Sequence, residues 1–204
     1  PGQKHTEVIL GMIRSGLAAS GGSRERLKGI AFGSGPGAFT GLRVACGLAQ
    51  GLGWALNLPL IPVNPLLALA YIHHETLEEG SRLLAAIDAR MHECYCAVFR
   101  YENKEFKELT APALCKPSEL LAIADDNGAD FLCGNAFRIY ADEIGNHAPK
   151  KLLSTDDVNA QMIVPLAQKY FEENKTVDAA EASPLYVRDH VALTIEERKA
   201  EKSR

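Results

Sequence analysis

This 204-residue chain lacks the features of a membrane protein, of a protein that binds nucleic acid by itself and of a secreted protein. No apolar run approaches the length that spans a bilayer, and no secretory signal opens the chain. A net charge of -4 and a pI near 5.9 leave too little positive charge to hold a nucleic-acid backbone unaided. These absences favour a cytoplasmic protein with no membrane contact.

The five cysteines are odd in number and scattered, which favours reduced thiols over a disulfide framework. Cys94 and Cys96 alternate along an expected strand and therefore share one of its sides. With His92 they could in principle hold a metal ion, but the spacing matches no common zinc pattern. We therefore expect inert thiols and no metal site. A composition of 47% hydrophobic and 24% charged residues suits one compact domain or two small lobes.

The most informative segment is a glycine turn at residues 33–43, which follows an apolar run and leads into a helix of small residues. Its glycines can take backbone angles closed to other residues, and its threonine is placed to cap the helix. The free N–H groups at such a helix start favour an anion. The candidate phosphate-proximal residues are Gly35, Gly37, Thr40, Gly41 and Arg43. A tight strand-to-helix turn without a ligand explains the same residues. It is not a Walker A loop, because the chain has no Gly-Lys-Ser/Thr.

Two helices with apolar faces are expected at residues 6–18 and 41–56. The first has one apolar stripe at helical spacing. The second has an apolar ridge and, at the same four-residue spacing, a groove of alanine and glycine that includes Gly53. Such a groove admits the close approach of another backbone, which is either the chain's own sheet or a partner helix. The candidate partner or dimer interface residues are Ile9, Met12, Ile13, Gly16, Val44, Ala45, Leu48, Ala49 and Leu52.

Apolar and alternating runs predict the other elements. The expected strands are 28–32, 58–63, 82–88, 94–101, 105–109 and 130–133, and the expected further helices are 65–73, 117–124 and 159–173. Pro165 predicts a kink or a restart in the last helix. A polar break near residue 77 divides the chain into a first lobe (1–77), a second lobe (78–190) and a charged tail (191–204) that we expect to fray.

Few residues form a pattern that is typical of a catalytic centre, and we expect no catalytic residue on this chain. Asp88 ends a predicted strand, where it could act as an acid or metal ligand or simply cap the following turn. Arg43 and Arg90 could each bind an anion or pair with a local carboxylate. Ser34 has no histidine and acid partners in an order that would support a hydrolase triad. The pair His73-His74 lies near a helix end, where a dipole or solvent role is the commoner one.

Residues 35–43 closely resemble the Gly-Pro-Gly-Ser-Phe-Thr-Gly-Leu-Arg signature of the bacterial TsaB (YeaZ) family. Five more stretches are similar to that family: Gln50-Gly51-Leu52, Pro59 to Asn64, Asp88-Ala89-Arg90-Met91, Gly134-Asn135-Ala136 and Pro184-Leu185-Tyr186-Val187-Arg188. The resemblance thus covers most of the chain. It implies an α/β fold of two duplicated lobes, like that of actin, sugar kinases and Hsp70 (ASKHA). A strand-rich stretch precedes the first helix in the family, so we expect the first lobe here to lack its leading strands.

A comparison with the paralogous catalytic family, TsaD, bears on metal binding. TsaD-like proteins carry Val-Asn-His-x-x-x-His after the equivalent helix and strand. The corresponding run here is Val63-Asn64-Pro65-Leu66-Leu67-Ala68-Leu69, in which Pro65 and Leu69 replace the histidines. Neither can ligate a metal ion. The resemblance therefore implies the non-catalytic member of a duplicated pair.

The resemblance implies a scaffold subunit in the synthesis of threonylcarbamoyladenosine at position 37 of tRNA. Its implied partners are a TsaD-type transferase and a TsaE-type ATPase, with tRNA met only through the complex and a homodimer when the chain is alone. We expect no cofactor on this chain by itself, although ATP or ADP could bind in the complex. One alternative is an autonomous ASKHA-type phosphotransferase or ATPase that uses the Gly35–Gly41 turn. A peptidase is the other, and no nucleophile–base arrangement supports it.

Overall fold

The computed structural model describes residues 5–187, which form a mixed α/β protein with two sheets. The α-helices are α1 (His5–Ala19), α2 (Phe39–Leu56), α3 (Pro65–Tyr71), α4 (Leu120–Asp126), α5 (Ala136–Ile139), α6 (Ala141–Ile144) and α7 (Ala160–Glu172). The strands are β1 (Ile30–Gly33), β2 (Leu60–Val63), β3 (Arg82–Arg90), β4 (Glu93–Glu102), β5 (Glu105–Glu108), β6 (Ala113–Cys115), β7 (Phe131–Cys133) and β8 (Lys151–Ser154). Short 3₁₀ turns occupy Arg24–Arg26, His74–Thr76 and Pro117–Glu119. The predicted tail at 191–204 lies outside the described residues.

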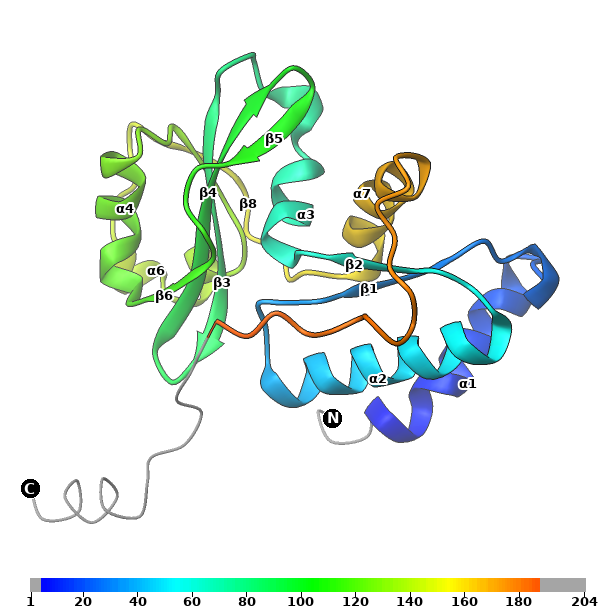
Figure 1. Ribbon diagram of the computed structural model, residues 1–204. Coiled ribbons are helices and arrows are strands. Elements are labelled where there is room, and N and C mark those ends of the chain that lie inside the picture. The colour runs from blue at the N-terminus through cyan, green and yellow to red at the C-terminus, as the bar shows by residue number, and fades with distance from the viewer. Residues whose placement is uncertain (1–4, 188–204) are drawn as a thin grey trace, which may run out of the picture.

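The first sheet has two parallel strands, β1 and β2, joined by α2. Helix α2 contacts both strands, and α7 contacts them as well, so the small sheet lies between two helices (Figure 1). The core on the α2 side contains Phe32, Cys46 and Leu60. On the α7 side it contains Val63 and Leu166. The two helices explain why Leu60, Ile61 and Val63 of β2 are buried, whereas Ala31 of β1 is exposed.

The second sheet has six strands in the order β5-β4-β3-β7-β8, with β6 also paired to β4. Strands β3 and β4 form a long antiparallel hairpin, whereas β7 and β8 run parallel to β3 and β7 respectively. One face packs apolar side chains against α4, α5 and α6. The other face packs against α3, whose Leu66 and Leu69 are fully buried. Helix α3, which follows β2 of the first sheet in the chain, therefore packs against the second sheet.

The last described residues, 177–187, return to the first sheet, and we call them the closing segment. Val177 forms an isolated antiparallel bridge with Leu60 of β2. The segment then runs between α2 and β1 (Figure 1), where Gln50 Nε2 donates a hydrogen bond to the Ala182 carbonyl at 3.0 Å. Both α7 and this segment lie with the first sheet although they follow residue 78. The division into lobes at residue 77 stays a prediction.

The structure confirms the expected helices at 6–18, 41–56, 65–73, 117–124 and 159–173 to within a few residues, and all six expected strands. The predicted cap at Thr40 is wrong, because α2 begins at Phe39 with Ala38 as its N-cap and no side-chain cap. A restart at Pro165 is also wrong, because α7 is a single helix. Buried Met162, Ile163, Leu166 and Ala167 anchor it on both sides of the proline. The prediction missed β6, β8, α5 and α6.

The small-residue groove of α2 packs in part against the chain's own sheet. Ala49 is only 3% exposed. A side chain at Gly53 would lie 2.7 Å from Leu60 Cδ2 and 3.1 Å from the Leu58 carbonyl oxygen, so glycine allows β2 to approach closely. Gly47 and Gly51 have nothing within 4 Å of a built Cβ. The chain's own sheet therefore explains the buried half of the groove.

Asn64 should stabilise α3 as its N-cap. Its Oδ1 accepts hydrogen bonds from the backbone N–H groups of Leu66 at 2.9 Å and Leu67 at 3.4 Å. We expect Asn64→Ala to lower the free energy of unfolding by about 1 kcal/mol, because two amide donors lose their acceptor. Asn64→Asp keeps an acceptor oxygen and is the matched control. Urea denaturation in which both variants matched the wild type would contradict the assignment.

Candidate functional site

The glycine turn, the end of β3 and the closing segment enclose a hollow of about 250 Å³, which we call the turn hollow. Gly37 and Thr40 line it from the turn, Arg90 from β3, and Tyr186 from the closing segment. These residues are more than 140 positions apart at the extremes of the sequence. The turn hollow therefore unites three stretches of the TsaB resemblance.

Gly35 faces the closing segment instead of the hollow. It is buried with a φ of +121°, and a Cβ there would collide with the Leu185 carbonyl oxygen. The Leu185 N–H donates to the Ser34 carbonyl at 2.7 Å, which holds the two backbones together. The need for glycine at position 35 is thus explained by packing within the chain. Gly41 is exposed on the first turn of α2.

Arg43 carries a positive charge that no carboxylate in the described part of the chain neutralises. Its guanidinium carbon lies 3.9 Å from the centre of the Phe39 ring. Its Nε donates a hydrogen bond to the Tyr186 hydroxyl at 3.0 Å. Phe39 and Tyr186 also contact each other, with ring centres 5.4 Å apart. The aromatic pair therefore holds the arginine in place and leaves its charge available.

The start of α2 adds to this positive character. The first amide N–H groups of a helix have no intrahelical acceptor, and the helix dipole places partial positive charge there. No acidic residue occupies the first turn of α2, and its N-cap gives no side-chain cap. Arg90, whose side chain is 83% exposed, lies across the hollow. The residues present fit an anionic group such as a phosphate.

Asp88 forms hydrogen bonds with its own hairpin and with residues that follow β7. Its Oδ1 accepts hydrogen bonds from the Arg90 N–H at 2.9 Å and the Tyr140 hydroxyl at 2.7 Å, and Oδ2 lies 3.6 Å from Arg90 Nη1. Asn135 Oδ1 accepts a hydrogen bond from the Asp88 N–H at 2.8 Å, and this bond links the ends of β3 and β7. Burial and the bond to Asp88 raise the pKa of Tyr140 to about 12. These contacts support the turn-capping interpretation of Asp88.

Cys94 and Cys96 lie on one side of β4, as expected, and both are buried. Cys96 Sγ lies 3.4 Å from Cys115 Sγ. Burial raises the pKa of Cys94 to about 12, so its thiol stays protonated. His92 instead pairs with Glu143 at 2.7 Å. Within residues 5–187, no three histidine, cysteine or acidic side chains are grouped as metal ligands.

A half-buried serine–histidine pair escaped the sequence analysis, because its members are 81 positions apart and carry no motif. His73 Nε2 lies 3.0 Å from Ser154 Oγ. No carboxylate forms an ion pair with His73 in the described chain, so the acid that orients a triad histidine is missing. Among the described residues, Ser34 forms no hydrogen bond to a histidine. Burial lowers the pKa of His73, and nearby Asp156 opposes this only in part.

The predicted interface residues divide by exposure. On α1, none of the residues 8–19 is buried. Met12 is 66% exposed and Ile13 is 42% exposed. Gly16 is also exposed, and Ile9 is half-buried. On α2, the partly exposed members are Val44, Ala45, Leu48 and Leu52. Ala49 belongs to the core of the first sheet and is not accessible. The accessible set lies on two helices that follow one another in the chain.

Residues 2–195 match the family described as tRNA N6-adenosine threonylcarbamoyltransferase, TsaD. A Haemophilus influenzae protein named tRNA threonylcarbamoyladenosine biosynthesis protein TsaB is 34% identical over 197 residues, covering 92% of this chain and 81% of that protein. The chain belongs to the TsaB (YeaZ) family. The Escherichia coli protein of the same name is also 34% identical, over 93% of this chain and 83% of its own.

A solved structure supports the family at the level of the fold. YeaZ from Pseudomonas aeruginosa superposes with a TM-score of 0.74 at 33% identity, covering 89% of this chain and 84% of that one. Pro65 and Leu69, which the resemblance sets at the histidine positions of TsaD-like proteins, are buried in α3, and neither has a side-chain atom that binds a metal. Among the described residues, no helix is both long enough and apolar enough to cross a bilayer.

Replacing Gly35 tests the packing of the glycine turn. Gly35→Ala should lower the free energy of unfolding by about 3 kcal/mol, because a strained backbone angle and a collision with Leu185 act together. Gly37→Ala is the matched control, since its Cβ would meet only Leu42 side-chain carbons at 3.5 Å or more. Denaturation curves for both variants measure the difference. Equal stability would show that the closing segment does not lie against Gly35.

The buried His73 should make stability depend on pH. Its folded pKa is below the unfolded value, so between about 6.5 and the lower folded pKa the unfolded chain binds more protons. The free energy of unfolding should therefore fall as the pH drops below about 6.5. His73→Gln cannot titrate and should flatten that slope. An unchanged slope in denaturant titrations at several pH values would contradict the assignment.

Proposed function

We propose that this chain is the non-catalytic scaffold of a complex that makes threonylcarbamoyladenosine in tRNA. The relatives named TsaB at 34% identity support this role. The match to the TsaD family suggests that the partner is a TsaD-type transferase, a paralogue of similar fold. A TsaE-type ATPase is the second proposed partner. We place the complex in the cytoplasm, with tRNA bound by the assembly.

The observation that carries this proposal is the uncovered apolar face of α1. Val8 is 45% exposed, Leu10 51%, Met12 66% and Ile13 42%. Val8 and Met12 are one turn apart on the same face of α1 and Ile13 flanks that face, whereas Leu10 lies on another side of the helix. Exposed apolar side chains grouped in this way are a patch of the kind that marks an interaction site. Their burial would contribute about 25 cal/mol for each Å² removed from water. A protein partner that covers α1 would supply this stabilisation.

We propose that the contact is made by two helices from each protein. On this chain we propose that they are α1 and α2, the latter through its partly exposed Val44 and Leu48. The chain would present one of two ASKHA-like lobes, built on the β1–β2 sheet, and the second lobe would be built on the β3–β4 sheet. A paralogue with the same two helices offers a similar face. The same face would form a homodimer when the partner is absent.

The turn hollow supports a nucleotide role within the complex. Arg43 and the start of α2 offer positive charge to a phosphate, and an ATP or ADP phosphate has the matching charge. A hollow of about 250 Å³ is smaller than typical ligand pockets, so this chain would hold only part of a nucleotide. Nucleotide binding would therefore need the partner. No cofactor is proposed for the chain alone.

Charge placed in the proposed face should prevent assembly. Ile13→Glu and Leu48→Glu should each weaken binding to the cognate TsaD-type protein at least about tenfold, because a carboxylate would be buried in an apolar contact. Ile139→Glu is the matched control: Ile139 is 44% exposed but lies on α5. Co-purification and calorimetry measure the affinities. Normal binding by both face variants would overturn the interface.

The same calorimetry distinguishes the scaffold from an autonomous enzyme. ATP should bind the pair, or the partner, but not this chain by itself. Magnesium-dependent ATP binding and turnover by the isolated chain would overturn the scaffold proposal. That result would favour the phosphotransferase alternative, in which the glycine turn works alone.

A further inference from the structure

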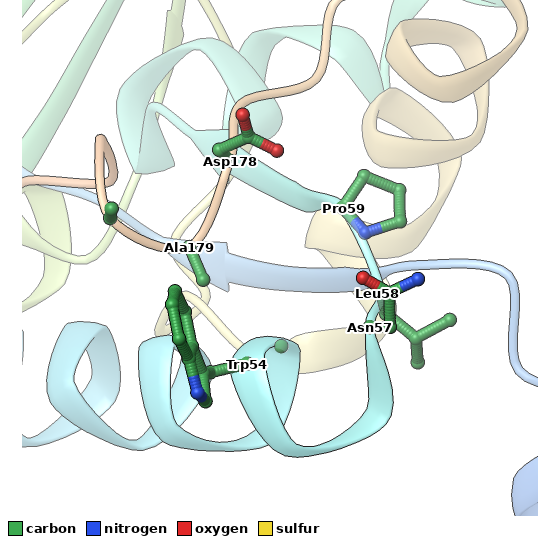
Figure 2. Close-up of a pocket in the computed structure, with 8 residues that line it drawn as sticks. Trp54, Asn57, Leu58, Pro59, Asp178 and Ala179 are labelled. Carbon is green, nitrogen blue, oxygen red and sulfur yellow. The ribbon is translucent and has the colours of Figure 1, made fainter.

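A second hollow lies at the other end of α2, and we call it the helix-end hollow. It measures about 600 Å³ and is bounded by the last turn of α2, the start of the loop to β2, and residues 178–180 of the closing segment. Figure 2 shows the Trp54 ring between α2 and the segment that carries Asp178 and Ala179, with Leu58 and Pro59 on the other side. None of these residues belongs to the turn hollow.

Trp54 is the single tryptophan of the chain and is 79% exposed. Its ring makes no aromatic, cation–π or hydrogen-bond contact with the other described residues. Tryptophan is enriched at the centres of protein interfaces, where its large flat surface is covered by the partner. An exposed tryptophan on the wall of a hollow is therefore typical of a surface that a partner protein covers.

The electrostatics of the helix-end hollow are negative. The 18-residue helix α2 ends here, and no basic residue in its last turn offsets the negative end of its dipole. Asp178 is exposed and forms no ion pair with any described residue. Glu181, one turn further on, is also exposed. The lysine nearest in sequence, Lys175, lies 2.8 Å from Glu173 and forms no ion pair with Asp178.

We propose that the helix-end hollow receives an arginine side chain from a partner protein. A guanidinium can stack on the indole of Trp54 beside the negative end of α2, and Asp178, whose carboxylate points away from the ring in Figure 2, adds a negative charge on the wall of the same hollow. Half of the lining residues (Trp54, Asn57, Asp178 and Ala180) are exposed, whereas a site for a free small molecule normally buries 70–90% or more of the ligand's surface. A side chain already positioned by its own protein needs no such enclosure. The proposal does not depend on the function proposed above.

The single tryptophan gives a direct measurement. A ¹⁵N–¹H spectrum of the whole chain contains one indole N–H signal, and the probe is the peptide acetyl-Gly-Arg-Gly-amide. The same peptide with citrulline in place of arginine has the same shape without the charge. Arginine peptide should shift the indole signal saturably, and the shift should weaken as salt is added. Citrulline peptide should not produce it.

Two variants separate the site from general attraction to an acidic protein. Asp178→Asn should weaken binding of the arginine peptide at least about fivefold, because a negative charge on the wall of the hollow is lost. Asp142→Asn removes one exposed acid on α6 and should leave the affinity unchanged. The Asp178 carbonyl bonds to the N–H groups of Glu181 and Ala182 remain in the variant, so the segment should stay in place. Equal binding of citrulline peptide, equal weakening by the two variants, or no saturable shift would each overturn the proposal.

Discussion

The close contact between the glycine turn and the closing segment is the constraint on which the site depends. Gly35 has no side chain, so the Leu185 backbone can reach the Ser34 carbonyl at 2.7 Å. That bond sets Tyr186 beside Phe39 and Arg43, and it draws the closing segment along α2 as far as Gln50 and Ala182. The absence of a side chain at Gly35 thus allows two parts of the chain that are distant in sequence to touch. Both hollows take one wall from the closing segment, which this contact holds in place.

The sequence predicted the long elements because their periodic patterns are local. Helix α1 and helix α2 carry apolar residues at helical spacing, and the strands of the β3–β4 hairpin are continuous apolar runs. Strand β6 has three residues and exists through its pairing with β4, which no local pattern announces. The error at Thr40 has a similar origin: the backbone of the turn brings Ala38 to the cap position two residues earlier. Pro165 did not end α7, because core packing on both sides outweighed one lost hydrogen bond.

The site was predictable where a motif carried it and unpredictable where only tertiary structure did. Gly37, Thr40 and Arg43 stand together near the turn hollow, as their spacing in one motif indicated, but the role of Tyr186 in holding Arg43 depends on a segment 143 positions away. The ends of β3 and β7 likewise meet through Asp88 and Asn135, two family-like stretches that touch in space. Trp54 carries no motif, and only its exposure in the folded chain marks it.

The two hollows lie at opposite ends of one helix and have opposite charge preference. With 18 residues, α2 is about 27 Å long. Its positive start, with Arg43, suits an anion, whereas its negative end, with Asp178, suits a cation. The Debye length at physiological ionic strength is about 8 Å, so a charge bound at one end is largely screened from the other. An anion in the turn hollow and a basic side chain in the helix-end hollow could therefore be bound together without opposing each other. A single helix would then give an acidic protein two separate points of charge recognition.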